Sequence, residues 1–183
     1  MLMKDVSMGE WVYKNPVKNS RNGLNLFIDA SKTNQSSVRV QLPKCRCPFG
    51  IDQKKADAGE YSRRNLELSA DDEEMQAFLA AFDKQNIAKA AENSEAWFRK
   101  KLSAESLNEL YRQALQVSTK DPDKYAPLCR VKISENGKNL TNIYTVYKDP
   151  DGNEKYRQGS VDDLNRNAMV VAQVEVSGLW FVR

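Results

Sequence analysis

The stretch Cys129–Ser134, which reads Cys-Arg-Val-Lys-Ile-Ser, alternates between apolar and charged residues. Side chains of a β-strand point to opposite faces with a period of two, so Val131 would be buried while Arg130 and Lys132 face solvent. The earlier run Ser37–Leu42 repeats the pattern. The sequence therefore predicts a half-buried sheet with a basic outer face, a surface that suits a phosphate backbone.

Length, cysteine count and hydropathy place the chain in a broad class. Its 183 residues fit one domain with enough interior for a core. Three cysteines and the lack of an apolar leader over Met1–Lys14 predict a reducing, intracellular compartment. No apolar run approaches the roughly twenty residues of a membrane span, so we expect a soluble protein.

The net charge of +3 is unevenly distributed. Residues 1–70 hold 12 Lys or Arg against 7 acids, and residues 124–183 hold 9 against 7. Residues 71–123 hold 7 against 11, so the middle of the chain is acidic while both flanks are basic.

The first basic segment shows the pattern of short strands separated by turns. Leu24–Asp29 is entered through the turn pair Asn22-Gly23, and Ser37–Leu42 is stopped by Pro43. Two further strands are expected at Glu10–Lys14 and Arg64–Leu68.

The acidic middle shows helical spacing. Ser69 is the expected N-cap of a helix that runs to about Ala91 and buries Met75, Phe78, Leu79 and Phe82. A shorter helix should hold Trp97 and Phe98. Ser103 should cap a third helix, whose apolar stripe consists of Leu107, Leu110, Tyr111, Ala114 and Leu115.

Strands return after residue 122. Asn136-Gly137 predicts a hairpin between Leu128–Ser134 and Thr141–Lys148, and Asp149–Gly152 predicts a second turn. Val161–Leu164 fits one helical turn. The apolar run Met169–Val182 is either paired inside the sheet or followed by further residues of a longer natural chain.

Strands, a helical insertion and returning strands fit a mainly β fold. The specific expectation is one oligonucleotide-binding (OB) domain over residues 1–183, a Greek-key five-stranded barrel with a helical insert at about 70–118.

Four short segments resemble the single-stranded DNA-binding proteins of large nucleocytoplasmic DNA viruses, which are distantly similar to the podoviral phage single-stranded DNA-binding protein. These segments are Lys124–Ile133, Val174–Phe181, Ser20–Gly23 and Phe27–Ala30. The resemblance implies an OB barrel with a helical insert, sequence-tolerant binding of single strands during viral replication at a nuclear or cytoplasmic site, and often a homodimer.

The same family typically carries an acidic C-terminal tail that recruits replication proteins. This sequence ends at Arg183, directly after the Trp180-Phe181 segment, without such a tail. The resemblance therefore implies replication proteins as partners only through a tail that this chain lacks, and the abrupt end favours a longer natural chain.

Sequence-tolerant binding of single strands needs cations for the backbone and aromatic rings on which bases stack. Trp97, Trp180 and Phe181 fit a core role better than a stacking role. The candidate nucleic-acid-binding residues are Trp11, Tyr13, Lys14, Arg21, Arg39, Lys44, Arg46, Phe49, Arg63, Arg64, Arg130, Lys132, Tyr144 and Lys148; the basic segments also hold Tyr61, Tyr147 and Tyr156.

Catalytic and metal-binding signatures are weak. The chain has no histidine, which removes Ser-His and Cys-His arrangements, and no glycine-rich phosphate loop. Cys45, Cys47 and Cys129 lack a fourth zinc ligand, so buried small residues or a solvent-facing thiol pair are expected instead, with no metal and no cofactor.

The sequence thus predicts a non-enzymatic single-stranded DNA-binding protein acting in viral replication, recombination or repair. One alternative is a metal-dependent nuclease built on Asp149, Asp151, Glu154 and Lys155, although turn chemistry explains these residues. The other alternative is an OB-type scaffold that binds protein.

Overall fold

The computed structural model describes the chain apart from residues 21, 34–35, 52–62, 136–139 and 182–183. The chain divides into two compact units, each assembled from segments far apart in sequence. Unit 1 comprises Met1–Pro43, Asp72–Leu115 and Val171–Arg183, and unit 2 comprises Lys44–Asp71 and Gln116–Val170. A single domain over residues 1–183 stays a prediction, because compactness alone does not show whether a unit folds by itself.

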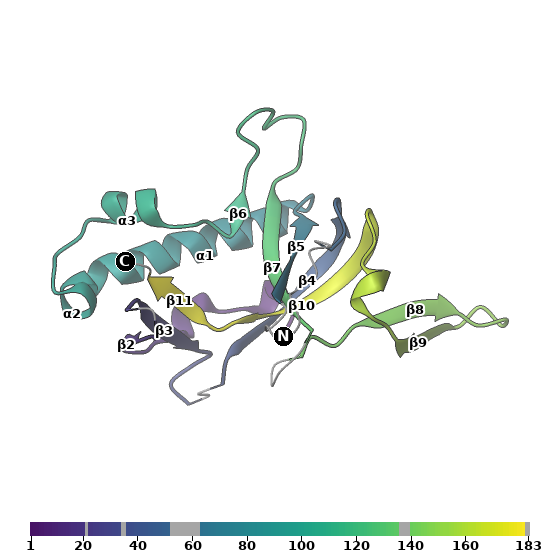
Figure 1. The fold of residues 1–183 in the computed structure, drawn as a ribbon, viewed down its shortest axis with the longest axis horizontal. Coiled ribbons are helices and arrows are strands. Elements are labelled where there is room, and N and C mark those ends of the chain that lie inside the picture. Colours follow the sequence, from purple (N-terminus) through teal and green to yellow (C-terminus); the bar gives the residue numbers. More distant parts are fainter. Residues whose placement is uncertain (21, 34–35, 52–62, 136–139, 182–183) are drawn as a thin grey trace. The chain divides into compact units, whose positions relative to one another are not determined.

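Strand residues outnumber helix residues, so the fold is mainly β, as predicted. Unit 1 contains β1 (Val12–Tyr13), β2 (Val17–Lys18), β3 (Leu24–Asp29), α1 (Glu73–Glu92), α2 (Ser94–Phe98), α3 (Ala104–Leu110), β11 (Gly178–Phe181) and two 3-10 turns, η1 (Met3–Asp5) and η2 (Met8–Glu10). Unit 2 contains β5 (Arg63–Ser69), β7 (Leu128–Ser134), β8 (Tyr144–Lys148), β9 (Glu154–Gln158) and η3 (Val161–Asp163). Three strands have residues in both units, namely β4 (Val38–Cys47), β6 (Leu115–Gln116) and β10 (Ala168–Val176), shown in Figure 1.

In unit 1, β3 pairs antiparallel with β1, β2 and β11. Its Leu26 and Ile28 are buried, which confirms the predicted strand. Gly178 begins β11 with φ +151°, and a Cβ there would lie 1.8 Å from the carbonyl oxygen of Leu26. Only glycine allows this approach of the two backbones.

The predicted helices form, but their ends differ from the prediction. Asp72, not Ser69, caps α1 by accepting a hydrogen bond from the Met75 amide, because Ser69 is still in β5. Met75 and Leu79 are buried as expected. Ser103 caps α3 as expected, but this helix ends at Leu110, whose side chain is exposed.

A buried polar network explains why α3 does not continue. Asp83 of α1 accepts hydrogen bonds from the backbone amides of Ala114 and Leu115, which are therefore not used in a helix. The Tyr111 hydroxyl also donates to Asp83 and accepts from the Asn86 amide, which in turn accepts from the Tyr13 hydroxyl at 2.8 Å. The network joins β1, α1 and the segment after α3.

Two tyrosines of this network make the stability of unit 1 depend on pH in the alkaline range. Burial raises the pKa of Tyr13 to about 12 and also raises the pKa of Tyr111. An unfolded tyrosine titrates near about pH 10, so the folded state holds these protons more tightly. The corresponding stability is fully present below about pH 10 and is lost as the pH rises toward 12. We expect the thermal midpoint to fall over this range, and to fall less in Tyr13→Phe; parallel profiles in circular-dichroism melts would contradict this.

In unit 2, β5 pairs antiparallel with β7 in a register that places Leu66 opposite Val131 and Glu67 opposite Arg130. Leu66, Leu68, Cys129 and Ile133 are buried, whereas Arg130 and Lys132 are exposed, so the predicted alternation of β7 is confirmed. The Cys129–Ser134 stretch thus forms the half-buried strand expected of it.

The predicted hairpin between Leu128–Ser134 and Thr141–Lys148 is wrong. β7 pairs with β5, while β8 pairs with β9. The Thr141 amide donates to the Ser134 carbonyl, so the two segments meet at their ends; Asn136 and Gly137 lie outside the described residues. The second predicted turn is confirmed, since Gly152 donates to the Asp149 carbonyl between β8 and β9.

Pro43 does not end its strand, because β4 continues to Cys47. The buried positions shift phase at this point, from Val38, Val40 and Leu42 to Cys45 and Cys47. Such a shift is typical of a β-bulge, where proline is tolerated. β4 pairs with β10, and the described strands form small open sheets.

Candidate nucleic-acid interface

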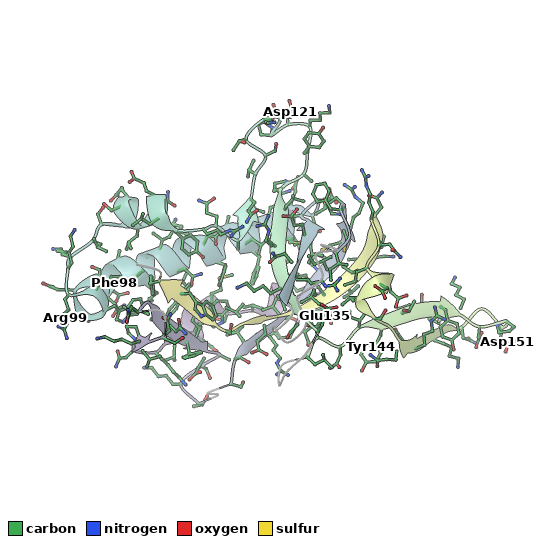
Figure 2. The ribbon with its side chains drawn as sticks, viewed as in Figure 1. Phe98, Arg99, Asp121, Glu135, Tyr144 and Asp151 are labelled. Carbon is green, nitrogen blue, oxygen red and sulfur yellow. The ribbon has the colours of Figure 1, made fainter. Side chains whose placement is uncertain are left out.

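The β8–β9 hairpin of unit 2 exposes three tyrosines, and we call it the tyrosine hairpin. Tyr144, Tyr147 and Tyr156 have exposed fractions of 60%, 46% and 68%. Tyr156 lies opposite Val146, and Tyr147 lies opposite Lys155. Tyr144 marks the start of the hairpin and Asp151 its turn in Figure 2.

Local chemistry shapes this hairpin. The Asp149 side chain accepts hydrogen bonds from the backbone amides of Asp151 and Asn153, and its carboxylate lies 3.8 Å from the Lys155 amine. Asp149 is thus occupied in shaping the turn, in agreement with the turn chemistry expected from the sequence. The hairpin also carries three exposed cations: Lys148 on the face of Tyr144 and Tyr156, and Lys155 and Arg157 on the opposite face with Tyr147.

A second feature of unit 2 is a hollow of about 370 Å³ lined by Phe49, Gly50, Ile51, Asn65, Glu67 and Arg130, which we call the Phe49 hollow. Phe49 lies at the edge of this hollow and is largely exposed. Gly50 fixes the turn that presents this ring, because it has φ +71° and a Cβ there would lie 2.7 Å from the Arg166 amide nitrogen. The structure thereby brings together Phe49 and Arg130, two of the predicted site residues.

Four predicted phosphate-binding cations form ion pairs instead of standing alone. Lys14 pairs with the buried Asp29 at 2.8 Å, Arg39 with Glu175, Arg64 with Glu135 at 2.7 Å, and Arg130 with Glu67 directly across the β5–β7 ladder. Each carboxylate cancels much of the positive field of its partner. The basic face predicted from the strands is therefore largely neutralised at these positions.

The other predicted cations have different surroundings. Lys44, Lys132 and Lys148 are exposed, and Arg46 donates to the Asn167 side chain at 3.3 Å. Arg21 lies outside the described residues, as do Tyr61 and the side chain of Arg63.

Two of the predicted stacking residues are corrected by the structure. Trp11 has an exposed fraction of only 6% and packs edge-on against Phe82 of α1, with ring centroids 5.9 Å apart. Tyr13 is partly buried and uses its hydroxyl in the polar network described above. Both residues belong to the interior of unit 1, because α1 packs against their side chains.

The prediction for Trp180 is wrong in the opposite direction. The sequence places it in the core, yet 53% of its surface is exposed, whereas its neighbour Leu179 is buried. Alternation along β11 could have indicated that Leu179 and Trp180 face opposite sides, but not which side is covered.

The side chains of Cys45, Cys47 and Cys129 are all buried. They lie on the interior faces of β4 and β7, which matches the prediction of buried small residues. Burial also raises the pKa of the Cys47 thiol. Within the described part of the chain, His, Cys, Asp and Glu side chains form no cluster of three or more able to hold a metal ion.

Within the same part of the chain, no helix is both long and apolar enough to cross a membrane.

Comparison with protein families gives one finding: a family of unknown function (DUF5871) matches residues 56–183. Comparison with curated proteins and with solved structures gives no match.

Proposed function

The chain belongs to DUF5871, a family of unknown function, and we propose that it is a sequence-tolerant single-stranded DNA-binding protein of a viral replication, recombination or repair system. The observation that carries this proposal is the tyrosine hairpin. Exposed tyrosine rings present flat π surfaces, and bases stack on such rings without regard to sequence. The resemblance of short segments to viral single-stranded DNA-binding proteins supports the same assignment.

The proposed architecture is the OB barrel. The mainly β fold with helices between β5 and β6 is consistent with it, and barrel closure is part of the proposal because the described strands form open sheets. In this arrangement the Phe49 hollow would take one base, stacked on Phe49 and hydrogen-bonded by Asn65.

The ion pairs change the expected energetics of binding. Four of the cations predicted to contact phosphate are already paired with carboxylates. Counterion release contributes a log-log salt slope of roughly −0.7 for each phosphate contacted by a single strand. We therefore propose that stacking supplies most of the affinity and that the salt slope is shallow, with contributions from exposed cations such as Lys44 and Lys148.

The hairpin tyrosines test the proposal directly. Tyr144→Ala, Tyr147→Ala and Tyr156→Ala are each expected to weaken binding of labelled oligo-dT by about 1–3 kcal/mol, because each removes one stacking surface. Their thermal midpoints should change little, since the side chains are exposed. The measurement is fluorescence anisotropy at two or more salt concentrations.

The matched control is Tyr125→Ala. Tyr125 is also an exposed tyrosine of unit 2, but it lies outside the hairpin in the segment before β7, with Lys124 over its ring. Its replacement should leave oligo-dT affinity unchanged. Wild-type protein that does not bind oligo-dT, or hairpin variants that bind like Tyr125→Ala, would overturn the proposal; magnesium-dependent cleavage of the oligonucleotide would favour a nuclease instead.

A further inference from the structure

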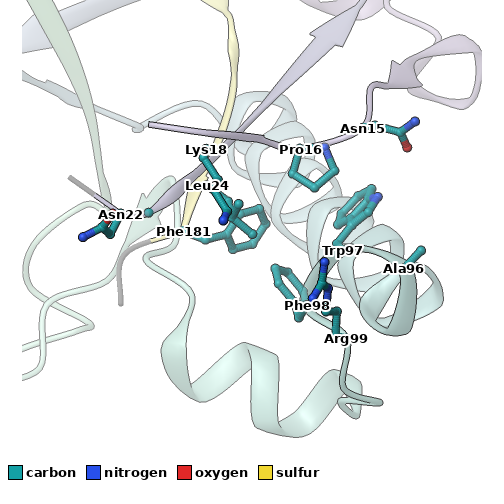
Figure 3. Close-up of a pocket in the computed structure, with 11 residues that line it drawn as sticks. Asn15, Pro16, Lys18, Asn22, Leu24, Ala96, Trp97, Phe98, Arg99 and Phe181 are labelled. Atoms are coloured by element: carbon teal, nitrogen blue, oxygen red, sulfur yellow. The ribbon is translucent and has the colours of Figure 1, made fainter. Parts of the chain in front are cut away.

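Unit 1 contains a larger hollow, of about 550 Å³, that the proposed function does not use (Figure 3). We call it the Phe98 hollow. Its strand side carries Lys18, Leu24 and Phe181, and its helix side carries Trp97, Phe98 and Arg99. The volume lies in the range of about 300–1,000 Å³ that is usual for small-molecule sites.

The pairing of β2, β3 and β11 positions the residues on the strand side of the hollow. Lys18 of β2 and Phe181 of β11 are both direct partners of Leu24 in the central strand β3. Directly opposed residues of antiparallel strands place their side chains on the same face, so these three side chains form one row. Gly23 next to this row is required, because a Cβ there would lie 2.5 Å from the Phe181 carbonyl oxygen.

Contacts between aromatic rings position the residues on the helix side of the hollow. The Phe98 ring meets Phe181 edge-on with centroids 4.8 Å apart, and Trp97 packs against both rings at 6.2 and 6.4 Å. Phe98 and Phe181 remain partly exposed. The hollow therefore presents partly exposed aromatic surface against which a flat ring can pack.

Arg99 has an unusual backbone for its residue type. It follows α2 in the left-handed conformation, with φ +57°, a position that glycine normally occupies at a helix end. An arginine here carries a backbone cost that a glycine would avoid. In return, its guanidinium lines the hollow.

The charge of this hollow differs from that of the predicted basic face. No Asp or Glu is among its described lining residues, and neither Lys18 nor Arg99 forms an ion pair within the described part of the chain. Lys14, Arg39, Arg64 and Arg130, in contrast, are neutralised by carboxylates. Two cations without a counter-charge favour an anionic ligand.

We propose that the Phe98 hollow binds a nucleotide unit, with its phosphate at Lys18 and Arg99 and its base against Phe98 and Phe181. Asn15 and Asn22 also line the hollow. The same chemistry is presented by a free nucleoside phosphate and by a nucleotide of a single strand. The lining residues all belong to unit 1 and the tyrosine hairpin belongs to unit 2, so the two sites share no residue.

The test is calorimetric titration of the full chain with dTMP. We expect one dTMP per chain, and binding at least about tenfold weaker for thymidine or inorganic phosphate alone, because each lacks half of the contacts. Lys18→Gln combined with Arg99→Gly should weaken dTMP binding by at least about tenfold. Arg99→Gly also relieves the left-handed backbone, so the thermal midpoint should not fall and lost binding cannot be ascribed to unfolding.

The matched control is Lys84→Gln, which removes an exposed cation of α1 outside the hollow and should leave dTMP binding within about twofold. Competition identifies the source of the nucleotide. If only 5′-phosphorylated oligo-dT displaces dTMP, the hollow holds a strand end; if unphosphorylated oligo-dT also displaces it, the hollow holds an internal nucleotide; if neither does, it holds a free nucleotide.

Three results would overturn the inference. The first is absence of dTMP binding, and the second is dTMP binding that the Lys18→Gln, Arg99→Gly variant retains. The third is preference for a short acidic peptide containing phenylalanine over dTMP, which would make the hollow a peptide site. This inference and the proposed function can fail separately. If only the proposed function is wrong, oligo-dT does not bind at the hairpin, while dTMP still binds the hollow.

Discussion

Replacing Trp11 by alanine is expected to lower the free energy of unfolding by about 3–5 kcal/mol, the usual loss for a buried large aromatic residue. The indole is 6% exposed and packs edge-on against Phe82 of α1, so its removal leaves a cavity beneath the helix. The folded fraction should bind oligo-dT with unchanged affinity, since the ring cannot reach a base. Urea denaturation and anisotropy titration of the same preparation measure the two effects.

Trp180→Ala is the matched control for this substitution. It removes the same side chain from β11, where 53% of the residue is exposed, so the loss of stability should be clearly smaller. A Trp11→Ala protein that keeps its stability but loses affinity would show that Trp11 is a base platform after all, and that its burial against α1 is not the relevant state.

Local patterns in the sequence were sufficient to predict several elements. The alternation in Cys129–Ser134 predicted β7 and its exposed Arg130 and Lys132, because a period of two is a property of one strand alone. The Ser103 cap of α3 and the turn at Asp149 were predictable for the same reason, since each depends on residues within one turn.

What the sequence did not predict depends on contacts between distant segments. Arg130 is neutralised by Glu67, 63 residues away, because the β5–β7 register places them opposite each other. Trp11 is buried because Phe82 of α1 packs against it, and no alternation within Glu10–Lys14 identifies the side that a distant helix covers. The candidate site therefore shifted from paired arginines on the strands to exposed tyrosines on β8 and β9.

The Phe98 hollow illustrates the same limit. Lys18 and Phe181 are 163 residues apart in sequence and become neighbours only because each pairs with Leu24 of β3. Arg99 has no local motif that marks it as a ligand-binding residue, and its left-handed backbone is visible only in the structure. Trp97 was correctly predicted to be buried. The hollow beside it could not be predicted, because it is lined by residues from distant segments of the chain.

A large loss of stability is also expected for Asp83→Ala. The Asp83 carboxylate accepts hydrogen bonds from the Ala114 and Leu115 amides and from the Tyr111 hydroxyl, all within 3.3 Å. Each buried donor left without an acceptor costs about 1–3 kcal/mol, so the variant should lose at least about 2 kcal/mol. Asp83→Asn should lose less, because it keeps one acceptor oxygen but turns an NH₂ group toward at least one donor.

The control for Asp83 is Glu92→Ala on the same helix. Glu92 forms an exposed ion pair with Lys89, one turn apart, and such pairs contribute about 0.3–0.5 kcal/mol. Chemical denaturation of the three variants should therefore rank Asp83→Ala below Asp83→Asn, with Glu92→Ala close to wild type. The Asp83 network also positions the segment that follows α3, so protease cleavage after Tyr111 or Arg112 should accelerate in Asp83→Ala. An Asp83→Ala protein as stable and as resistant to cleavage as Glu92→Ala would show that water replaces the carboxylate and that the network does not hold this segment in place.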